Sequence, residues 1–192
     1  MHKPDYSFDD FAFGTKTIHA GQPPEEQTGA VMTPIFQTST YAQKSPGEHT
    51  GYEYSRTKNP TRSALEDCIA SLEDGEYGLA FGSGCAATST VMYLLDEGGH
   101  VISGDDIYGG TFRLFDKVHD DMGLDFSFVD LTDLDALETA VNNDTELIWL
   151  ESPTNPLLKI CDIEQICDFA HARDITVAVD NTFMSPYFQN TP

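Results

Sequence analysis

The stretch Gly82-Ser83-Gly84-Cys85-Ala86-Ala87-Thr88 decides the fold that the sequence predicts. An apolar run at residues 77–81 precedes it, and a segment compatible with a helix follows it to about Leu95. In a strand, turn and helix of this kind, the unpaired amides of the first helical turn point at an anion in the turn. Glycines let the main chain approach that anion closely. The stretch therefore indicates a phosphate site, but a tight strand-to-helix turn without a ligand has the same composition.

Apolar runs and amphipathic segments alternate along the rest of the chain. Strands are expected at residues 77–81, 101–103, 124–129, 147–150 and 175–179, and helices at 85–95, 110–119, 134–142 and 163–172. This order predicts an α/β fold, a mostly parallel sheet with helices on both faces. Such sheets bind ligands at the carboxyl ends of their strands. The segments Glu151–Pro156 and Asp180–Thr182 follow two strands and are therefore candidates.

The amino-terminal part has a different pattern. Residues 1–58 are rich in proline, glycine and polar side chains, which predicts an extended arm. Asn59 and Pro60 supply a capping residue and a first-turn proline, so a helix is expected to begin there and to end at Gly75. We therefore expect two parts, an arm at 1–58 and an α/β domain at 59–192.

Composition excludes several classes of protein. The chain has 32 acidic and 10 basic residues, a net charge of −22, which disfavours nucleic-acid and anionic-membrane partners. No window has the apolar length of a bilayer span, and the N-terminus lacks a basic stretch followed by an apolar core, so a cytoplasmic protein is expected. The six histidines lack metal-ligand spacing, and the four cysteines form no CxxC pair, so we expect no metal site and reduced, packed cysteines.

A dinucleotide site is an alternative interpretation of the glycine turn. Gly82, Gly84 and Ala87 fit a permissive form of the NAD(P) fingerprint, and Asp105 or Asp106 lies about 20 residues further on, where a ribose-binding acid is expected. This motif is therefore compatible with an NAD(P)-dependent oxidoreductase. That scheme gives Asp180 no role, and it places the fingerprint near the start of its domain, whereas here a long segment precedes it.

Six motifs in order carry a resemblance to a known family. They lie at residues 17–21, 52–62, 83–88, 106–111, 151–156 and 179–182. Together they resemble the pyridoxal-phosphate-dependent enzymes of Cys/Met metabolism, most closely the cystathionine gamma-synthase and gamma-lyase type. The resemblance runs from about Thr15 to the last residue. It implies the large domain of fold-type I pyridoxal phosphate enzymes, incomplete at its C-terminus, and a lyase or transferase that acts on an amino acid by γ-elimination or γ-replacement.

The resemblance also assigns site residues. The backbone amides of Gly84 and Cys85 would hold the phosphate of pyridoxal 5'-phosphate, and Tyr108 would stack on its ring. Asp180 would face the pyridine nitrogen and keep it protonated, and Asn155 would contact the cofactor on the substrate side. The structural alternatives are a core tyrosine at 108, a turn cap at 180 and a purely structural turn around 155. Tyr108 and Asp180 are the residues expected to take part in catalysis.

Tyr54 and Arg56 alternate in a segment expected to be extended, so their side chains emerge on one face and can meet one anion. In the family they reach the phosphate of a neighbouring subunit, which implies a homo-oligomer, a dimer or tetramer. The alternative is an exposed pair within one chain.

The family's cofactor-binding lysine and its C-terminal domain have no counterpart here. Lys117 and Lys159 are the only lysines after the glycine turn, and neither stands in a matching motif. The 192 residues are therefore expected to be inactive alone, as part of a longer enzyme. A truncated, non-catalytic paralogue that acts as a binding module is the other possibility.

Overall fold

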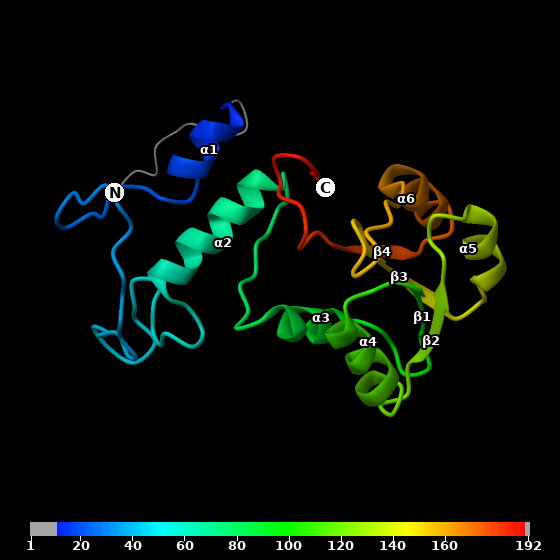
Figure 1. The fold of residues 1–192 in the computed structure, drawn as a ribbon. Coiled ribbons are helices and arrows are strands. Elements are labelled where there is room, and N and C mark those ends of the chain that lie inside the picture. The colour runs from blue at the N-terminus through cyan, green and yellow to red at the C-terminus, as the bar shows by residue number, and fades with distance from the viewer. Residues whose placement is uncertain (1–10, 191–192) are drawn as a thin grey trace. The chain divides into compact units, whose positions relative to one another are not determined.

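The computed structural model describes residues 11–190, and these form two compact units (Figure 1). The first unit extends to residue 80 and the second begins at residue 81. The functional division that the sequence suggests at residue 58 stays a prediction.

A four-stranded parallel sheet forms the centre of the second unit. Its strands are β1 (His100–Gly104), β2 (Asp125–Val129), β3 (Thr145–Glu151) and β4 (Thr176–Asp180). They lie in the order β2-β1-β3-β4, and every neighbouring pair is parallel. All of β1 and most of β3 are buried, which is why these strands are continuous apolar runs in the sequence. The predicted α/β class and the last four predicted strands are confirmed.

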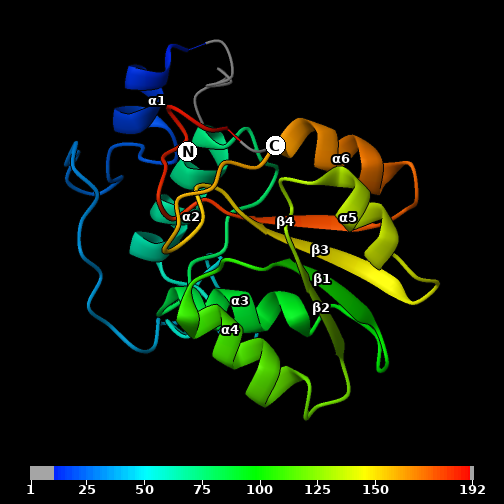
Figure 2. The ribbon, with the colours of Figure 1, turned by 45° about the vertical axis from the view of Figure 1, so that its right-hand side comes forward.

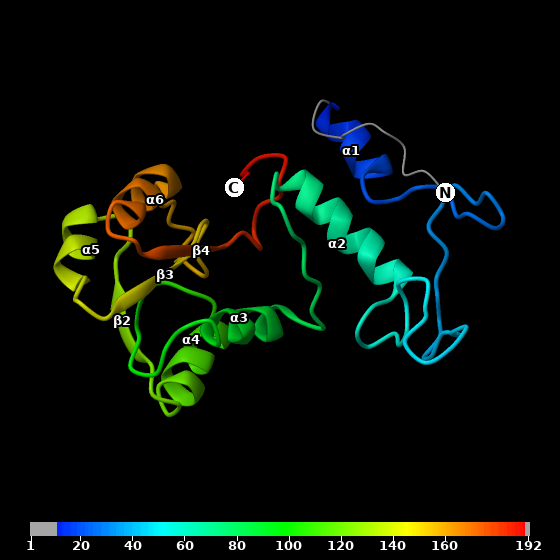
Figure 3. The same ribbon diagram turned by 180° about the vertical axis from the view of Figure 1, so that it is seen from behind.

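Helices cover both faces of this sheet. They are α3 (Gly84–Met92), α4 (Gly109–Leu114), α5 (Leu134–Ala140) and α6 (Ile163–His171), and α4 continues into a π-helical turn, η1 (Phe115–His119). Figures 2 and 3 show α3 and α4 on one side of the strands and α5 and α6 on the other. The helix expected at residues 110–119 is therefore present, but its second half is wound more loosely.

Two apolar clusters fill the spaces between sheet and helices. Successive strand residues point to opposite faces, so the alternating residues of β3 belong to different clusters. Leu147 and Trp149 pack with Phe115 under α3 and η1, whereas Ile148 and Leu150 pack against α5 and α6. This two-sided packing fixes which face each residue at the strand ends presents.

The first unit contains two helices, α1 (Phe13–His19) and α2 (Pro60–Leu72). The predicted start of α2 is confirmed, because the Asn59 side chain accepts a hydrogen bond from the amide of Thr61 at 2.9 Å. The expectation of an extended arm is wrong at α1. Lys16 is buried there and donates to Asp74 at 2.9 Å, which attaches α1 to the end of α2. Residues 1–10 of the expected arm lie outside the described residues.

The strand predicted at residues 77–81 is absent from the structure. A strand is stable only beside another, and no described residue pairs with this segment. It runs along α2 instead, where a Cβ at Gly78 would come within 2.1 Å of the Glu66 carbonyl oxygen, and where the Ala80 amide donates to the Glu66 side chain at 3.0 Å. The apolar side chains of Tyr77 and Leu79 consequently remain exposed.

Candidate cofactor site

The ends of β3 and β4 place two carboxylates side by side. Glu151 is the last residue of β3 and pairs in register with Asp180, the last residue of β4. Residues paired in this way on parallel strands point to the same face of a sheet. Two positions earlier, Trp149 and Ala178 pack into the cluster that contains Met92 of α3. Glu151 and Asp180 therefore point to the face that α3 and α4 cover.

The glycine turn leaves open space beside the first amides of α3. Ser83 caps the helix, and its hydroxyl accepts from the amide of Ala86 at 3.2 Å. Apart from the adjoining backbone, no atom of residues 11–190 lies within 4 Å of the Cβ that a larger residue would place at Gly82 or Gly84, and neither glycine has a positive φ. Neither packing nor backbone conformation within the chain requires glycine at these positions. The space is therefore available to a ligand that approaches the amides of Gly84 and Cys85.

The direction of α3 brings this end of the helix toward the carboxyl edge of the sheet. Residues 93–99 lead from the end of α3 to the amino end of β1, so the helix runs back along the strands. Its nine residues span about 14 Å, close to the length of a five-residue strand. The amino end of α3 thus lies on the same face and toward the same edge as Asp180. The Cys85 side chain is exposed there, so the packing role expected for it is wrong.

Tyr108 lies at the same edge, in the connection between β1 and α4. Its amide donates to Oε2 of Glu151 at 2.9 Å, and the residue is 48% exposed, so it is not a core tyrosine. The ring rests against Gly110, where a Cβ would come within 2.3 Å of the ring atom Cε1. Because glycine has no side chain, the Tyr108 ring can occupy this space. The exposed part of the ring offers an aromatic surface for stacking.

Asp180 is half-buried and uses one oxygen for the local turn. Its Oδ1 accepts from the amide of Thr182 at 3.1 Å and from the Thr182 hydroxyl at 2.5 Å. Asp180 therefore does cap the local turn, as the structural alternative has it, but it uses only Oδ1 to do so. Among residues 11–190, no hydrogen bond reaches Oδ2, so a second donor such as a protonated ring nitrogen can bind there.

Glu151 completes this group, and the sequence analysis did not select it as a site residue. Its side chain is 6% exposed. Burial raises the pKa of its carboxyl, the Tyr108 amide opposes that effect, and the neighbouring carboxylates of Asp180 and Asp106 raise the pKa further. The available signal was an acidic residue at the end of an apolar strand, directly after residues 147–150. A charge at such a position costs free energy unless it is paired or hydrogen-bonded.

The loop that carries Asn155 is held by Thr154 and Asp106. The Thr154 hydroxyl donates to Asp106 Oδ2 at 2.5 Å and accepts from the Lys159 amide at 2.8 Å. Asp106 Oδ2 also accepts from the Leu157 amide at 2.9 Å. Asn155 is half-buried, and no residue between 11 and 190 forms a hydrogen bond with its side chain. The loop is thus fixed while the Asn155 amide is left available.

The two acidic residues that could bind the ribose of a dinucleotide form other contacts in the structure. Asp106 is buried and bonded within the loop, and Asp105 accepts from the Lys159 ammonium at 2.9 Å. Both carboxylates therefore already have partners within the chain. The dinucleotide interpretation is therefore not favoured.

Tyr54 and Arg56 lie in the first unit, where they contact each other. The Arg56 guanidinium donates to the Tyr54 hydroxyl at 3.0 Å, and both side chains are exposed. Tyr54 forms a bridge with Thr40, but a turn begins at Ser55, so the expected extended segment ends there. The predicted proximity of the two side chains is found, with an exposed guanidinium beside a phenol.

A family model described as Cys/Met metabolism PLP-dependent enzyme matches residues 14–191. The chain belongs to this family. The resemblance inferred from the six motifs is confirmed, and the members of the family are pyridoxal-phosphate-dependent enzymes.

Relatives with curated names agree with this membership. The chain is 56% identical over 180 residues to "Probable cystathionine gamma-synthase" of Herpetosiphon aurantiacus, which covers 94% of this chain and 56% of the relative. It is 54% identical over 176 residues to cystathionine beta-lyase of Coxiella burnetii, 91% of this chain and 46% of the relative. The chain thus spans about half the length of the curated relatives it matches.

The solved structures show the same fold. The crystal structure of metB from Corynebacterium glutamicum superposes with a TM-score of 0.92 at 42% sequence identity. The match covers 95% of this chain and 48% of that one. The described α/β unit therefore has the architecture of the Cys/Met metabolism PLP-dependent enzymes.

The two lysines after the glycine turn are held by carboxylates. Lys159 pairs with Asp105 and Asp130, each at 2.9 Å, and these two carboxylates raise the pKa of its ammonium. In return, the hydrogen bond from Lys159, together with two from Thr132, lowers the pKa of Asp130 to about 2. Lys117 bonds Asp116 at 2.6 Å, which raises the pKa of its ammonium too. Both ammonium groups are thus paired with carboxylates.

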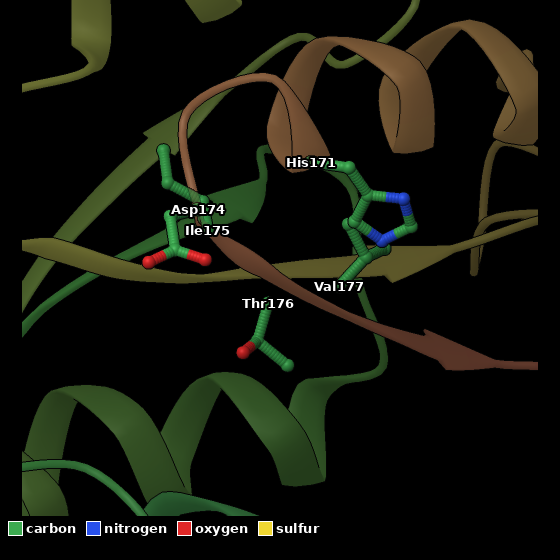
Figure 4. Close-up of a pocket in the computed structure, with 5 residues that line it drawn as sticks. All are labelled: His171, Asp174, Ile175, Thr176 and Val177. Atoms are coloured by element: carbon green, nitrogen blue, oxygen red, sulfur yellow. The ribbon is translucent and has the colours of Figure 1, made fainter.

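A cavity lies at the other edge of the sheet. Figure 4 shows its lining at the end of α6 and the start of β4, with His171, Asp174, Ile175, Thr176 and Val177. It is separated from the candidate site by the length of β4. Within residues 11–190, no three acidic, histidine or cysteine side chains are grouped as metal ligands, and no helix is long and apolar enough for a bilayer crossing.

Proposed function

We propose that the chain supplies a pyridoxal 5'-phosphate site of an enzyme of sulfur amino-acid metabolism. The proposed reaction is γ-elimination or γ-replacement on a homoserine- or cysteine-derived amino acid, as in a cystathionine gamma-synthase or gamma-lyase. The observation that supports it most is the in-register pair of Glu151 and Asp180, which lies on the α3 face beside Tyr108. The name of the Herpetosiphon aurantiacus relative, a probable cystathionine gamma-synthase, supports the same reaction class.

Each residue has a definite task in this proposal. The amides of Gly84 and Cys85 donate to the phosphate, where the helix dipole also favours an anion. The Tyr108 ring stacks on the cofactor ring, and the Asn155 amide orients its substrate side. The Asp180 carboxylate accepts from the ring nitrogen and keeps a proton at that atom. When bound, pyridoxal phosphate withdraws electrons from the substrate's α carbon.

The isolated chain is proposed to bind the cofactor without turnover. Neither Lys117 nor Lys159 stands in the motif of the lysine that holds the cofactor's aldehyde in this family, and both are paired with aspartates. The exposed Tyr54 and Arg56 pair supports a homo-oligomer in which these side chains reach a partner's phosphate. A cytoplasmic location and a small amino-acid substrate complete the proposal.

The test uses pyridoxine 5'-phosphate, which has the ring and phosphate of the cofactor but no aldehyde that could label surface lysines. We expect the 192-residue chain to bind it, as measured by ligand fluorescence, and Asp180→Asn to weaken binding at least about tenfold, since a hydrogen bond to a charged group contributes about 1.5–3 kcal/mol. Asp125→Asn, at the amino end of β2, is the matched control. Equal binding by both variants, or binding of NADH in place of the pyridoxine ligand, would contradict the proposal.

A further inference from the structure

Glu151 is the buried charged group for which the proposed site has no task. It is 6% exposed and its Oε2 accepts from the Tyr108 amide at 2.9 Å. We propose that Glu151 is a positioning residue that fixes Tyr108 and, beside Asp180, adds a second negative charge near the ring nitrogen of the cofactor. This inference rests on the proposed function and adds a residue to it.

Glu151 and Gly110 together fix the position of Tyr108. Tyr108 is the residue before α4, and none of its side-chain atoms caps that helix. The Glu151 carboxylate, which lies on another element, accepts a hydrogen bond from the Tyr108 amide, and a negative charge is favourable at this end of a helix. With the amide held by Glu151 and the ring resting against Gly110, both ends of Tyr108 are fixed. A ring fixed in this way is ready for stacking before a ligand arrives.

Glu151 and Asp180 also bring two carboxylates together at one edge of the sheet. Glu151 and Asp180 are register partners on one face of the sheet, and Asp106 is the other carboxylate that acts on Glu151. Asp106 is already bonded by Thr154 and Leu157, and Asp180 shares one oxygen with Thr182. Lys159, the lysine nearest in sequence, is bonded to Asp105 and Asp130. A protonated ring nitrogen would therefore be the cation that this pair of carboxylates receives.

A purely structural role makes a different prediction. If Glu151 only caps α4, a glutamine there replaces it, because the amide oxygen still accepts from Tyr108. Glu151→Gln therefore keeps the cap and removes the charge, whereas Glu151→Ala removes both. Glu146→Gln is the matched control, because Glu146 also lies on β3 and accepts from a backbone amide, that of Asp96 at 3.1 Å, but at the opposite end of the strand.

The experiment titrates pyridoxine 5'-phosphate bound to the 192-residue chain. Ultraviolet absorbance follows the protonation of the ring nitrogen against pH, and the induced circular dichroism of the ligand follows the fixed ring geometry. In Glu151→Gln we expect the dichroism to remain and the midpoint for loss of the ring proton to fall by on the order of one pH unit. In Glu151→Ala both signals should change, and in Glu146→Gln neither.

Each outcome separates the two proposals. A Glu151→Gln titration equal to that of Glu146→Gln would overturn the inference and leave the proposed function intact. The same holds if Glu151→Gln unfolds at as low a urea concentration as Glu151→Ala, since the residue would then serve folding alone. Failure of the unmodified chain to bind pyridoxine phosphate would overturn the proposed function, and the inference with it.

Discussion

Replacement of Thr154 by valine tests the link that holds the Asn155 loop. Thr154 is 3% exposed, and its hydroxyl both donates to the buried Asp106 carboxylate and accepts from the Lys159 amide. A hydrogen bond to a charged group contributes about 1.5–3 kcal/mol and a neutral one about 0.5–1.5 kcal/mol. Valine has the same shape and neither bond. We therefore expect Thr154→Val to lower the free energy of unfolding by about 2 to 4 kcal/mol.

Urea unfolding measures this loss through the single tryptophan. Trp149 is buried in β3, so its fluorescence reports the unfolding of the sheet. Thr132→Val is the matched control, because the Thr132 hydroxyl also donates to an aspartate, Asp130, but at an exposed position where water replaces it. The control should lose no more than about 0.5 kcal/mol. Equal losses in the two variants would refute the idea that the buried bond holds the loop.

Three further outcomes are expected. Gly110→Ala should displace the Tyr108 ring and weaken pyridoxine phosphate binding about threefold to tenfold in a fluorescence titration, whereas Gly109→Ala, whose Cβ would meet only a flexible arginine tip at 3.4 Å, should not. Burial lowers the pKa of His100, so the unfolded chain binds the proton more tightly, and the free energy of unfolding should fall as the pH decreases below about 6.5. Urea unfolding at pH 7 and pH 5 measures this fall, which should be smaller in His100→Gln than in the unmodified chain. Burial also raises the pKa of the Cys161 thiol to about 11, so iodoacetamide at pH 8 should modify it only after unfolding, as mass spectrometry would show.

Much of the sheet was predictable because its signal is local. Strands buried on both faces must be apolar along their whole length, and residues 147–150 and 175–179 show this without reference to the rest of the chain. Helix starts were equally accessible where a capping side chain and a proline mark them, as at Asn59 and Pro60. The expected helix end at Gly75 was three residues late, because α2 ends at Leu72.

The failures depend on contacts between distant residues. The apolar run at 77–81 has the composition of a strand, but it lies along α2 because Gly78 fits closely against Glu66. Helix α1 depends on a buried lysine that reaches Asp74, 58 residues away. Local composition contains neither contact, so propensity alone gave the wrong state.

The candidate site divides in the same way. Tyr108 and Asp180 were found from motifs, and the structure places both at one edge of the sheet. Glu151 was missed because its role is defined by a bond to a residue 43 positions earlier and by its pairing with β4. An acidic residue at the end of a buried strand is the pattern that would have indicated it.

The place of β4 in the sheet affects how strongly Asp180 can act. In the described sheet β4 is the outermost strand, and β3 is its one hydrogen-bonded neighbour. Water can therefore approach the carboxylate from the other flank and screen its field, which makes charge interactions several times weaker than in a dry interior. A cofactor ring bound here by the 192 residues alone would therefore dissociate readily. Any chain segment that covered this flank would exclude water and strengthen the binding of the ring without adding a new charge.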